Sequence, residues 1–259
     1  MRSNIYNKVQ WQLRWLLPVC LLVLLPLPLL SQTTLSGDSA YIHENFQQAI
    51  ERYEQQLKQG VSADLYFNLG NAYYRTGNFT RAIINYERAL LLSPGDEEIR
   101  FNLQMARSKT IDKITPESEM FFVTWYRSLV NMMSVDAWAR TALVTLALAI
   151  IMALLYLFSD RIWLRKTGFF ASILLLALFL LSNLFAFQQK RKLTLRTGAV
   201  VTASAVTVKS TPSKNGTDLF ILHEGTRVDI KDGSMQEWKQ VRLADGREGW
   251  VKTTEVEEI

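Results

Sequence analysis

Hydrophobic and polar residues follow three different patterns along the chain, and each pattern predicts a different kind of element. From residue 36 to about residue 115, apolar residues recur at the spacing of amphipathic helices. Residues 141–187 are almost entirely apolar apart from one short charged interruption, which predicts two long apolar helices. From residue 198 onward, short alternating runs are separated by Gly, Asp, Asn and Pro, as in a small all-β unit. The sequence therefore predicts a multidomain protein.

The segment LYFNLGNAYYRTGNFTRAIINYERALLLSPGD, at residues 65–96, carries small and aromatic residues at regular intervals. It resembles the tetratricopeptide repeat, a helical hairpin of about 34 residues, at every position of the repeat pattern. The small residues let two antiparallel helices approach closely, the tyrosines fill the space between them, and Gly77-Asn78 makes the turn. The matching positions are Tyr66, Leu69, Gly70, Tyr73, Ala82, Tyr86, Ala89 and Pro94.

Weaker copies of this segment stand on both sides of it, as expected because one repeat cannot bury its own faces. A shift of 33 residues aligns NFQQAIERYEQQLKQG with NFTRAIINYERALLLS, and a shift of 34 aligns IRFNLQMARSKTID with LYFNLGNAYYRTGN. The last copy has Gln104 in place of the glycine and Arg107 in place of the tyrosine, which suits a capping helix. We therefore predict an α-helical tetratricopeptide repeat array over residues 36–115.

The first helix of each repeat in such arrays lines a concave face, so its polar residues outside the packing set are the candidate protein-binding residues. Their amides can hold a partner's backbone, Arg75 can pair with a carboxylate, and Tyr74 can add apolar area. We expect Tyr74 and Arg75 to be exposed. For Asn68 and Asn102, the alternative is that they only tie neighbouring helices together. The predicted site consists of Asn68, Asn71, Tyr74, Arg75 and Asn102.

Residues 116–136 predict an amphipathic helix, because large apolar residues recur there at helical spacing opposite polar ones. Three roles are open for this helix. It can lie in the membrane interface with its aromatic residues at headgroup depth, pack against the repeat array, or serve as a partner surface. The apolar residues are Phe121, Phe122, Trp125, Leu129, Met132 and Met133.

Two transmembrane helices are predicted, and the basic residues around them set their orientation. The turn between the helices carries three basic residues, so the positive-inside rule places it in the cytoplasm. The sequence QQKRK opposes this topology, because it puts three positive charges on the external side. The predicted segments are the helix at residues 137–159, the turn at residues 160–168, the helix at residues 169–187 and a basic linker at residues 188–197.

The N-terminal residues 1–31 have the layout of a secretory signal, with basic residues ahead of an apolar run from Trp15 to Leu30. We predict a signal peptide cleaved near Ser31, and the alternative is an uncleaved anchor. Either form exports the residues that follow. Cleavage would remove Cys20, the single cysteine, so a disulfide or a thiol nucleophile is not expected in the mechanism.

The formal net charge of +5 is not spread evenly along the chain. Residues 32–135 hold 10 Lys and Arg against 12 Asp and Glu, and residues 198–259 hold 8 against 10. The excess positive charge therefore lies at the N-terminus and around the apolar segments. It indicates targeting and membrane orientation, and it does not indicate a nucleic-acid partner.

Residues 198–259 resemble bacterial SH3-like domains through VTVKSTPS, LHEGTRVDI and WKQVRLADGREGWV. The resemblance implies a small all-β barrel, and Asp245-Gly246 is a strong hairpin signal within it. Thr207-Val208-Lys209 stands where such domains usually have Asn-Val-Arg, so a ligand contact through that arginine is in question. Trp238 and Trp250 are core residues in one interpretation and a ligand platform in the other.

The order of these parts, together with DEEIRFNLQMARSKTIDKI, resembles the BatE family of the Bacteroides-type aerotolerance operon along almost the whole chain. The resemblance implies a two-pass inner-membrane scaffold whose repeat array and SH3-like domain face the periplasm. It also implies protein partners among the other operon products, including von Willebrand A-domain membrane proteins and a MoxR-type ATPase, in tolerance of oxygen or other stress. No enzymatic activity comes with this family.

The sequence itself offers little that points to catalysis. His43 and His223 are far apart in the sequence, and we expect both to be surface residues. No zinc-binding spacing, phosphate loop or Ser/His/Asp arrangement is recognisable, so neither an enzyme nor a cofactor or metal site is predicted. Two functions remain: a membrane scaffold that binds proteins in the repeat groove, or an envelope sensor or tether that binds peptidoglycan through its SH3-like domain.

Overall fold

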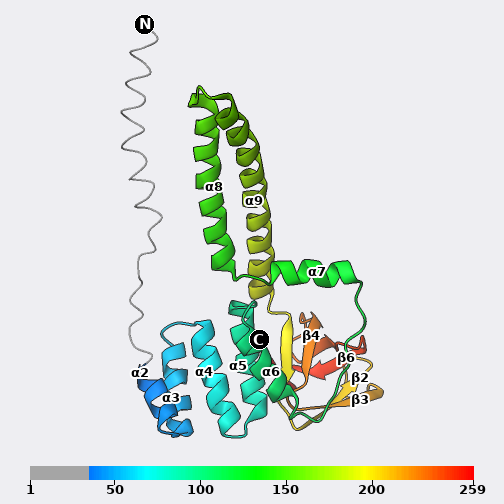
Figure 1. Cartoon of the computed structure of the whole chain (residues 1–259). Helices are drawn as coiled ribbons and strands as arrows, with labels where there is room; N and C mark the ends of the chain where they lie inside the picture. Colours follow the sequence, from blue (N-terminus) through cyan, green and yellow to red (C-terminus); the bar gives the residue numbers. More distant parts are fainter. Residues whose placement is uncertain (1–34) are drawn as a thin grey trace. The chain divides into compact units, whose positions relative to one another are not determined.

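The computed structural model describes residues 35–259, and its elements are labelled in Figure 1. The predicted signal peptide at residues 1–31 and its cleavage site lie outside the described residues. From residue 35 onward, five short helices are followed by a lone helix, a pair of long helices and seven strands. This order agrees with the three patterns of the sequence at the level of a helical region, two apolar helices and a β-region.

The first five helices form a left-to-right series of neighbours in Figure 1, in which each helix packs against the next along the chain. A polar side chain accepts a backbone N–H bond at the start of each helix after the first, which satisfies donors that the helix itself leaves unpaired. The capping residues are Asn45, Ser62, Asn78 and Asp96. The helices are α2 (Leu35–Ile42), α3 (Phe46–Leu57), α4 (Ala63–Arg75), α5 (Phe79–Leu92) and α6 (Glu97–Arg107).

Two glycines set how closely these helices approach. A Cβ atom on Gly70 of α4 would lie 2.6 Å from Cε1 of Tyr86 on α5, so the tyrosine ring rests directly on the α4 backbone. Gly37 of α2 has the same relationship to Tyr53 of α3, at 2.4 Å. Both pairs are related by a shift of 33 residues, the shift found in the sequence. The repeat register therefore extends back into α2.

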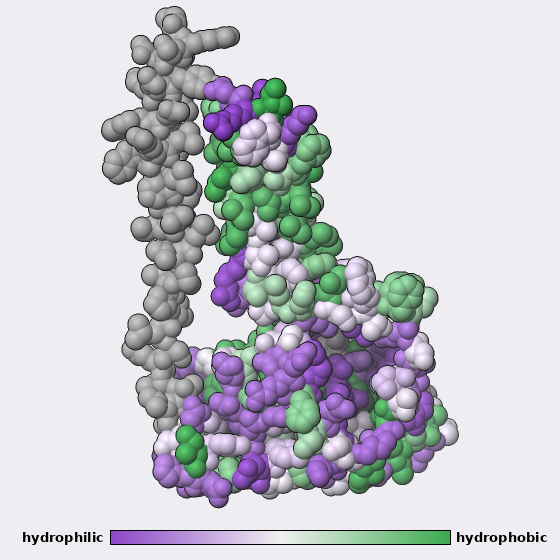
Figure 2. Space-filling model, viewed as in Figure 1, coloured by the Kyte–Doolittle hydropathy of each residue, from purple (hydrophilic) through white to green (hydrophobic). Residues whose placement is uncertain are grey.

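The α8 and α9 helices run side by side as an antiparallel hairpin (Figure 1). By length and composition, α8 (Val135–Phe158) and α9 (Ile162–Leu195) are apolar enough to cross a membrane. Figure 2 shows a hydrophobic surface along this hairpin. A Cβ atom on Gly168 of α9 would lie 2.8 Å from the carbonyl oxygen of Met152 on α8, so the two backbones touch there.

The helix α9 is longer than the apolar segment that we predicted for it. Its first residues belong to the predicted turn at residues 160–168, and its last turns include most of the predicted linker at residues 188–197. Trp, Leu, Arg, Lys and Gln are good or acceptable helix formers, and neither segment contains proline, so nothing stops the helix there. The helix ends at Leu195, and the residue that follows, Arg196, has a left-handed conformation with φ of 41°.

The C-terminal region is a seven-stranded antiparallel sheet in the order β3-β2-β6-β5-β4-β1-β7. The alternating runs expected from the sequence, at residues 206–209, 219–222, 227–230, 238–241 and 249–251, all lie in strands. Gly246 has a positive φ of 88° in the β5–β6 turn. The inward residues, mostly valine, form a core of their own. The strands are β1 (Gly198–Val201), β2 (Ala205–Lys209), β3 (Asp218–His223), β4 (Arg227–Asp232), β5 (Trp238–Arg242), β6 (Glu248–Lys252) and β7 (Val256–Glu258).

The sheet packs against α5 through apolar residues. Val200 of β1 and Ile259, which follows β7, belong to the same buried cluster as Ala82 and Ile83 of α5. Val200 and Ile83 are fully buried. The helical region and the sheet therefore share this one cluster, called the shared core below, although 90 residues of chain between α6 and β1 separate them in the sequence.

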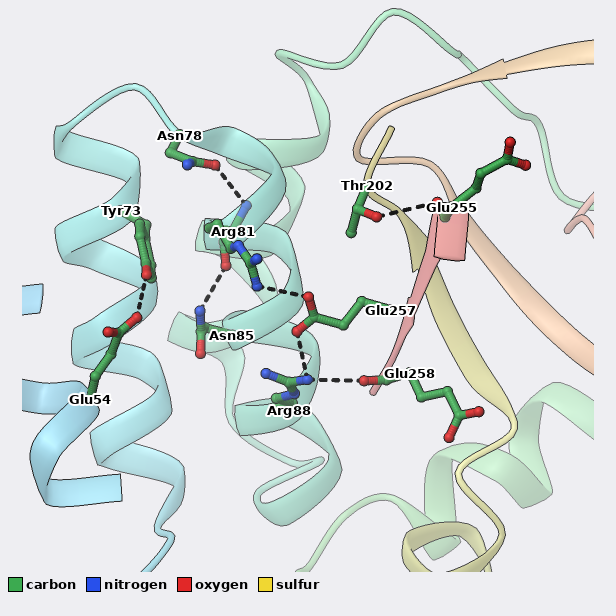
Figure 3. Close-up of polar contacts among 10 residues, drawn as sticks. All are labelled: Glu54, Tyr73, Asn78, Arg81, Asn85, Arg88, Thr202, Glu255, Glu257 and Glu258. Atoms are coloured by element: carbon green, nitrogen blue, oxygen red, sulfur yellow. Dashed lines mark hydrogen bonds and ion pairs between the residues drawn. The ribbon is translucent and has the colours of Figure 1, made fainter. Parts of the chain in front are cut away.

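Ion pairs surround this shared core. Figure 3 shows Arg81 and Arg88 of α5 reaching the two carboxylate oxygens of Glu257 on β7, at 2.7 Å and 2.9 Å. On the other side, the buried carboxylate of Glu87 lies 3.6 Å from Nε of Arg227 on β4. The helix α5 thus supplies the basic partners at one edge of the contact and the acidic partner at the other. Because only one placement of the sheet pairs both sets of charges, the ion pairs fix the orientation in which the sheet lies on α5.

The loop after α6 continues the contact along the sheet. The carboxylate of Asp112 accepts hydrogen bonds from the His223 backbone N–H at 2.7 Å and from the Thr226 hydroxyl at 2.6 Å, and it pairs with Nδ1 of His223 at 2.8 Å. Burial opposes ionisation of Asp112, but the hydrogen bonds from Thr226 and His223 outweigh it and lower the pKa of Asp112 below its usual value. His223 is therefore half-buried in this network, in contrast to the surface position that we expected.

Candidate functional site

The inner faces of α2 and α4 enclose a hollow of about 210 Å³. Aromatic rings form part of its wall, and a carboxylate and two amides project into it. This is the face on which the sequence predicted a protein-binding site, and the hollow is the part of it with a definite shape. Its lining residues are Asp38, Tyr41, Ile42, Tyr53, Asn68 and Asn71.

The hollow lies in a groove between α2 and α4, and the polar residues at the α2 end of this groove are joined by hydrogen bonds. Oδ1 of Asp38 accepts hydrogen bonds from the Tyr53 hydroxyl at 2.6 Å and from Nδ2 of Asn68 at 3.3 Å. Burial and the hydrogen bond to Asp38 both raise the pKa of Tyr53 far above its usual value, so the hydroxyl keeps its proton and remains a donor. Three helices are thereby joined at one carboxylate oxygen.

The same arrangement recurs one repeat further along. Oδ1 of Asn71 accepts hydrogen bonds from the Tyr86 hydroxyl at 2.7 Å and from Nδ2 of Asn102 at 3.0 Å. Burial raises the pKa of Tyr86, which also keeps its hydroxyl protonated. Asn68 and Asn102 therefore do tie neighbouring helices together, as the alternative interpretation proposed, and so does Asn71.

The groove nevertheless keeps polar atoms available for a partner. Within residues 35–259, Oδ2 of Asp38 and Nδ2 of Asn71 have no hydrogen-bond partner. Oδ2 of Asp38 is an acceptor and Nδ2 of Asn71 is a donor. In both side chains, Oδ1 is held by two hydrogen bonds. The two unbonded polar atoms are suited to the N–H and C=O groups of a peptide backbone.

Tyr74 does not occupy the position that we expected from the sequence. It is half-buried, and its ring packs edge-on against Phe79 at the start of α5, with 5.4 Å between ring centroids. Tyr41 packs in the same way against Phe46, at 5.3 Å, one repeat earlier. This tyrosine therefore closes the turn between two helices in each repeat, and the expectation that Tyr74 is a free surface residue is wrong.

Arg75 is exposed, but it contacts the preceding repeat. Its guanidinium lies 4.8 Å from the centre of the Phe46 ring, and Nη2 lies 3.8 Å from the Glu44 carboxylate. Of the five predicted site residues, Asn68 and Asn71 line the hollow and Asn102 supports Asn71, whereas Tyr74 and Arg75 contact the helix turns.

The residues of α2 are the part of the site that sequence reasoning missed. Asp38, Tyr41 and Ile42 line the hollow, and Ile42 is 76% exposed. A signal was present, because a shift of 33 residues aligns Gly37 with Gly70 and Asp38 with the similar Asn71. The sequence comparison aligned the repeats only from Asn45 onward, where the similarity is stronger.

Residues 63–96 match the tetratricopeptide repeat family, and this match covers α4, α5 and the turn that follows them. No curated protein matches the chain. The helical region thus contains a tetratricopeptide repeat at α4 and α5, which suggests interaction with other proteins.

Proposed function

We propose, taking the tetratricopeptide repeat at residues 63–96 as the premise, that this protein is a membrane-anchored scaffold that holds a partner protein in the groove between α2 and α4. The single observation that carries the proposal is the pair of unbonded polar atoms, Oδ2 of Asp38 and Nδ2 of Asn71, on rigidly held side chains of that groove. Rigid donors and acceptors bind with little loss of side-chain entropy.

The anchor in this proposal is the α8–α9 hairpin. A core helix of a soluble protein is buried mostly by its own fold, whereas the most apolar windows of α8 and α9 are only 17% and 6% buried. Such an apolar surface is unfavourable in water, and lipid would cover it. The apolar stretches carry no charge at their centres, which favours an anchor over a transport role.

The proposed topology places the repeat region and the sheet on the same side of the membrane, in the periplasm. The shared core of Val200, Ile259 and α5 supports a common side, because the two regions can pack together only there. The basic tip of the hairpin and the predicted export signal support the periplasm. Protease added outside spheroplasts should then digest both regions, and protection of the sheet alone would contradict the topology.

The seven short antiparallel strands support a bacterial SH3-like barrel for residues 198–259. In the proposal, this barrel has a structural role, because it packs against α5 and so supports the helical region that carries the groove. The resemblance to the BatE family supports partners among aerotolerance-operon membrane proteins with von Willebrand A domains. It also supports a role in a stress-response complex without enzymatic activity.

A photo-crosslinking residue in place of Ile42 tests the groove. Ile42 lines the hollow and is 76% exposed, so the substitution is cheap for folding. Val61 is the matched control, because it is also an exposed β-branched residue, at 59%, but lies outside the lining. In native membranes, position 42 should crosslink to one specific protein and position 61 should not. Equal crosslinking from both positions, or none from position 42, would contradict the proposal.

A further inference from the structure

The helix α7 (Phe121–Val130) exposes more aromatic surface than a surface helix in water usually does. Phe121 is 85% exposed, Trp125 is 64% exposed and Phe122 is 52% exposed. At about 100° per residue, these residues fall on one side of the helix together with Tyr126, Leu129 and Val130. The other side carries Thr124 and Arg127, and Ser128 lies at the border beside Phe121.

Such a helix is not stable in water on its own. It has ten residues, below the length of about 12 to 15 residues at which isolated helices become marginally stable. The residue before it, Met120, makes no side-chain capping bond. Only its last residue, Val130, is buried. Some further surface must therefore cover the apolar side of α7.

The last turn of α7 is fixed to the base of the hairpin. The carbonyl oxygen of Val130 accepts hydrogen bonds from Nε1 of Trp138 on α8 at 3.0 Å and from Nε2 of Gln189 on α9 at 2.7 Å. Figure 1 shows α7 leaving the hairpin at this point and not running alongside it. This junction places α7 where the apolar part of the hairpin ends.

The apolar side of α7 is also continuous with the apolar surface of the hairpin. The ring of Tyr126 packs edge-on against Phe185 of α9, with 6.0 Å between centroids. Phe185 lies within the apolar stretch of α9, so the aromatic side of α7 borders the surface that lipid would cover. On the polar side, Arg127 pairs with Glu119 at 2.9 Å. Figure 2 shows the exposed hydrophobic side chains of α7 and of the hairpin.

We propose that α7 lies in the membrane interface, with Phe121, Phe122 and Trp125 inserted among the lipid headgroups and upper acyl chains. This inference rests on the proposed membrane anchoring, because the same bilayer would cover α8 and α9. Amphipathic helices with aromatic residues on the apolar side adopt this position, where the rings are buried and the polar side remains in water.

Spin labels on single cysteines test the position of α7 in the full chain, with Cys20→Ser as the background. Trp125→Cys places a label on the apolar side, and Arg127→Cys, two residues further along the chain, places the matched control on the polar side of the same helix. Leu176→Cys, in the exposed apolar stretch of α9, reports on the membrane anchoring itself. The protein is reconstituted into phospholipid nanodiscs, and collisions of each label with oxygen and with a water-soluble nickel complex are measured.

We expect the label at position 125 to collide more with oxygen than with nickel, and the label at position 127 to show the reverse. A water-exposed label at position 125, with a lipid-exposed label at position 176, would overturn the interfacial helix alone. A label at position 125 shielded from both reagents would also overturn it, because protein would then cover α7. A water-exposed label at position 176 would overturn the membrane anchoring.

Discussion

The ring of Tyr86 rests on the backbone of Gly70, so close that a Cβ atom at position 70 would lie 2.6 Å from Cε1 of the ring. Tyr86 is almost fully buried and has no room to move away. The contact joins α4 to α5 within the matched repeat, and the same contact between Gly37 and Tyr53 joins α2 to α3. These two close approaches set the distance between the paired helices that carry the groove residues.

We predict that Gly70→Ala destabilises the α4–α5 pair by about 1–3 kcal/mol, because the new methyl group overpacks the interface with Tyr86. Hydrogen exchange of the α4 and α5 amides measures the change. Gly60→Ala is the control, since no atom lies within 4 Å of a Cβ at that position and its φ is not positive. Exchange rates that change equally in both variants would contradict the packing role of Gly70.

We predict that Tyr86→Phe destabilises the same helices by about 0.5–1.5 kcal/mol, the usual net value of a hydrogen bond. The phenyl ring keeps the packing against Gly70, but Oδ1 of Asn71 loses one of its two donors. The thermal unfolding midpoint in detergent measures the effect. Tyr73→Phe, which removes a bond to the exposed Glu54, should lower the midpoint less. The reverse order would argue against a structural role for the Asn71 bonds.

The contact of the loop after α6 with the sheet should depend on pH through Asp112. Its hydrogen bonds lower its folded pKa below the unfolded value of about 3.9, so the carboxylate stabilises the contact above that pH. The stabilisation is lost as pH falls through the still lower folded pKa. Hydrogen exchange of the His223 amide should therefore be slow at pH 6 and accelerate in acid beyond its intrinsic pH dependence.

In Asp112→Ala, we expect this amide to exchange quickly at every pH, with the loop contact weakened by about 1.5–3 kcal/mol. Asp160→Asn, at the exposed tip of the hairpin, is the control and should leave exchange at His223 unchanged. An amide that stays protected in Asp112→Ala would show that Asp112 does not hold the loop.

Packing of the sheet against α5 should depend more on apolar burial than on the surrounding charges. Val200→Ala leaves a cavity in the shared core and should weaken the packing by about 2 kcal/mol. Glu257→Gln removes two partly exposed ion pairs and should cost about 1 kcal/mol or less, with a further dependence on salt. Limited proteolysis of the region between α9 and β1 measures both. If Glu257→Gln increased cleavage more than Val200→Ala, the greater importance of apolar burial would be contradicted.

The matched repeat and the strands were predictable because their signals are local. Residues 65–96 contain both helices, both turn residues and the small positions of one hairpin, so the whole pattern lies within one segment. The strands follow from alternation and turn residues within a few positions of each other. The polar interactions of the groove required the register of two repeats at once, and the first repeat keeps only Gly37, Asp38 and Tyr41 of the pattern in α2.

The remaining features had no local signal. The packing of β1 on α5 brings Val200 and Ile83 into one cluster, and neither segment contains a sequence pattern that indicates the other as its partner. Tyr74 resembled a free groove residue because its partner, Phe79, lies across a turn and belongs to the next helix. The length of α9 was underestimated because apolarity was used to place its ends, whereas helix propensity continues into the polar residues on either side.

The shared core between α5 and the sheet has a mechanical consequence. The chain leaves this core after α6, passes through α7 and the hairpin, and returns to the core from α9 at β1. If the hairpin spans a membrane, a force that a bound partner exerts on the groove is divided between two helices. Neither helix can be pulled from the bilayer separately until the sheet detaches from α5. Under that condition, the resistance of the anchor to extraction depends on the contact between α5 and the sheet, which lies outside the bilayer.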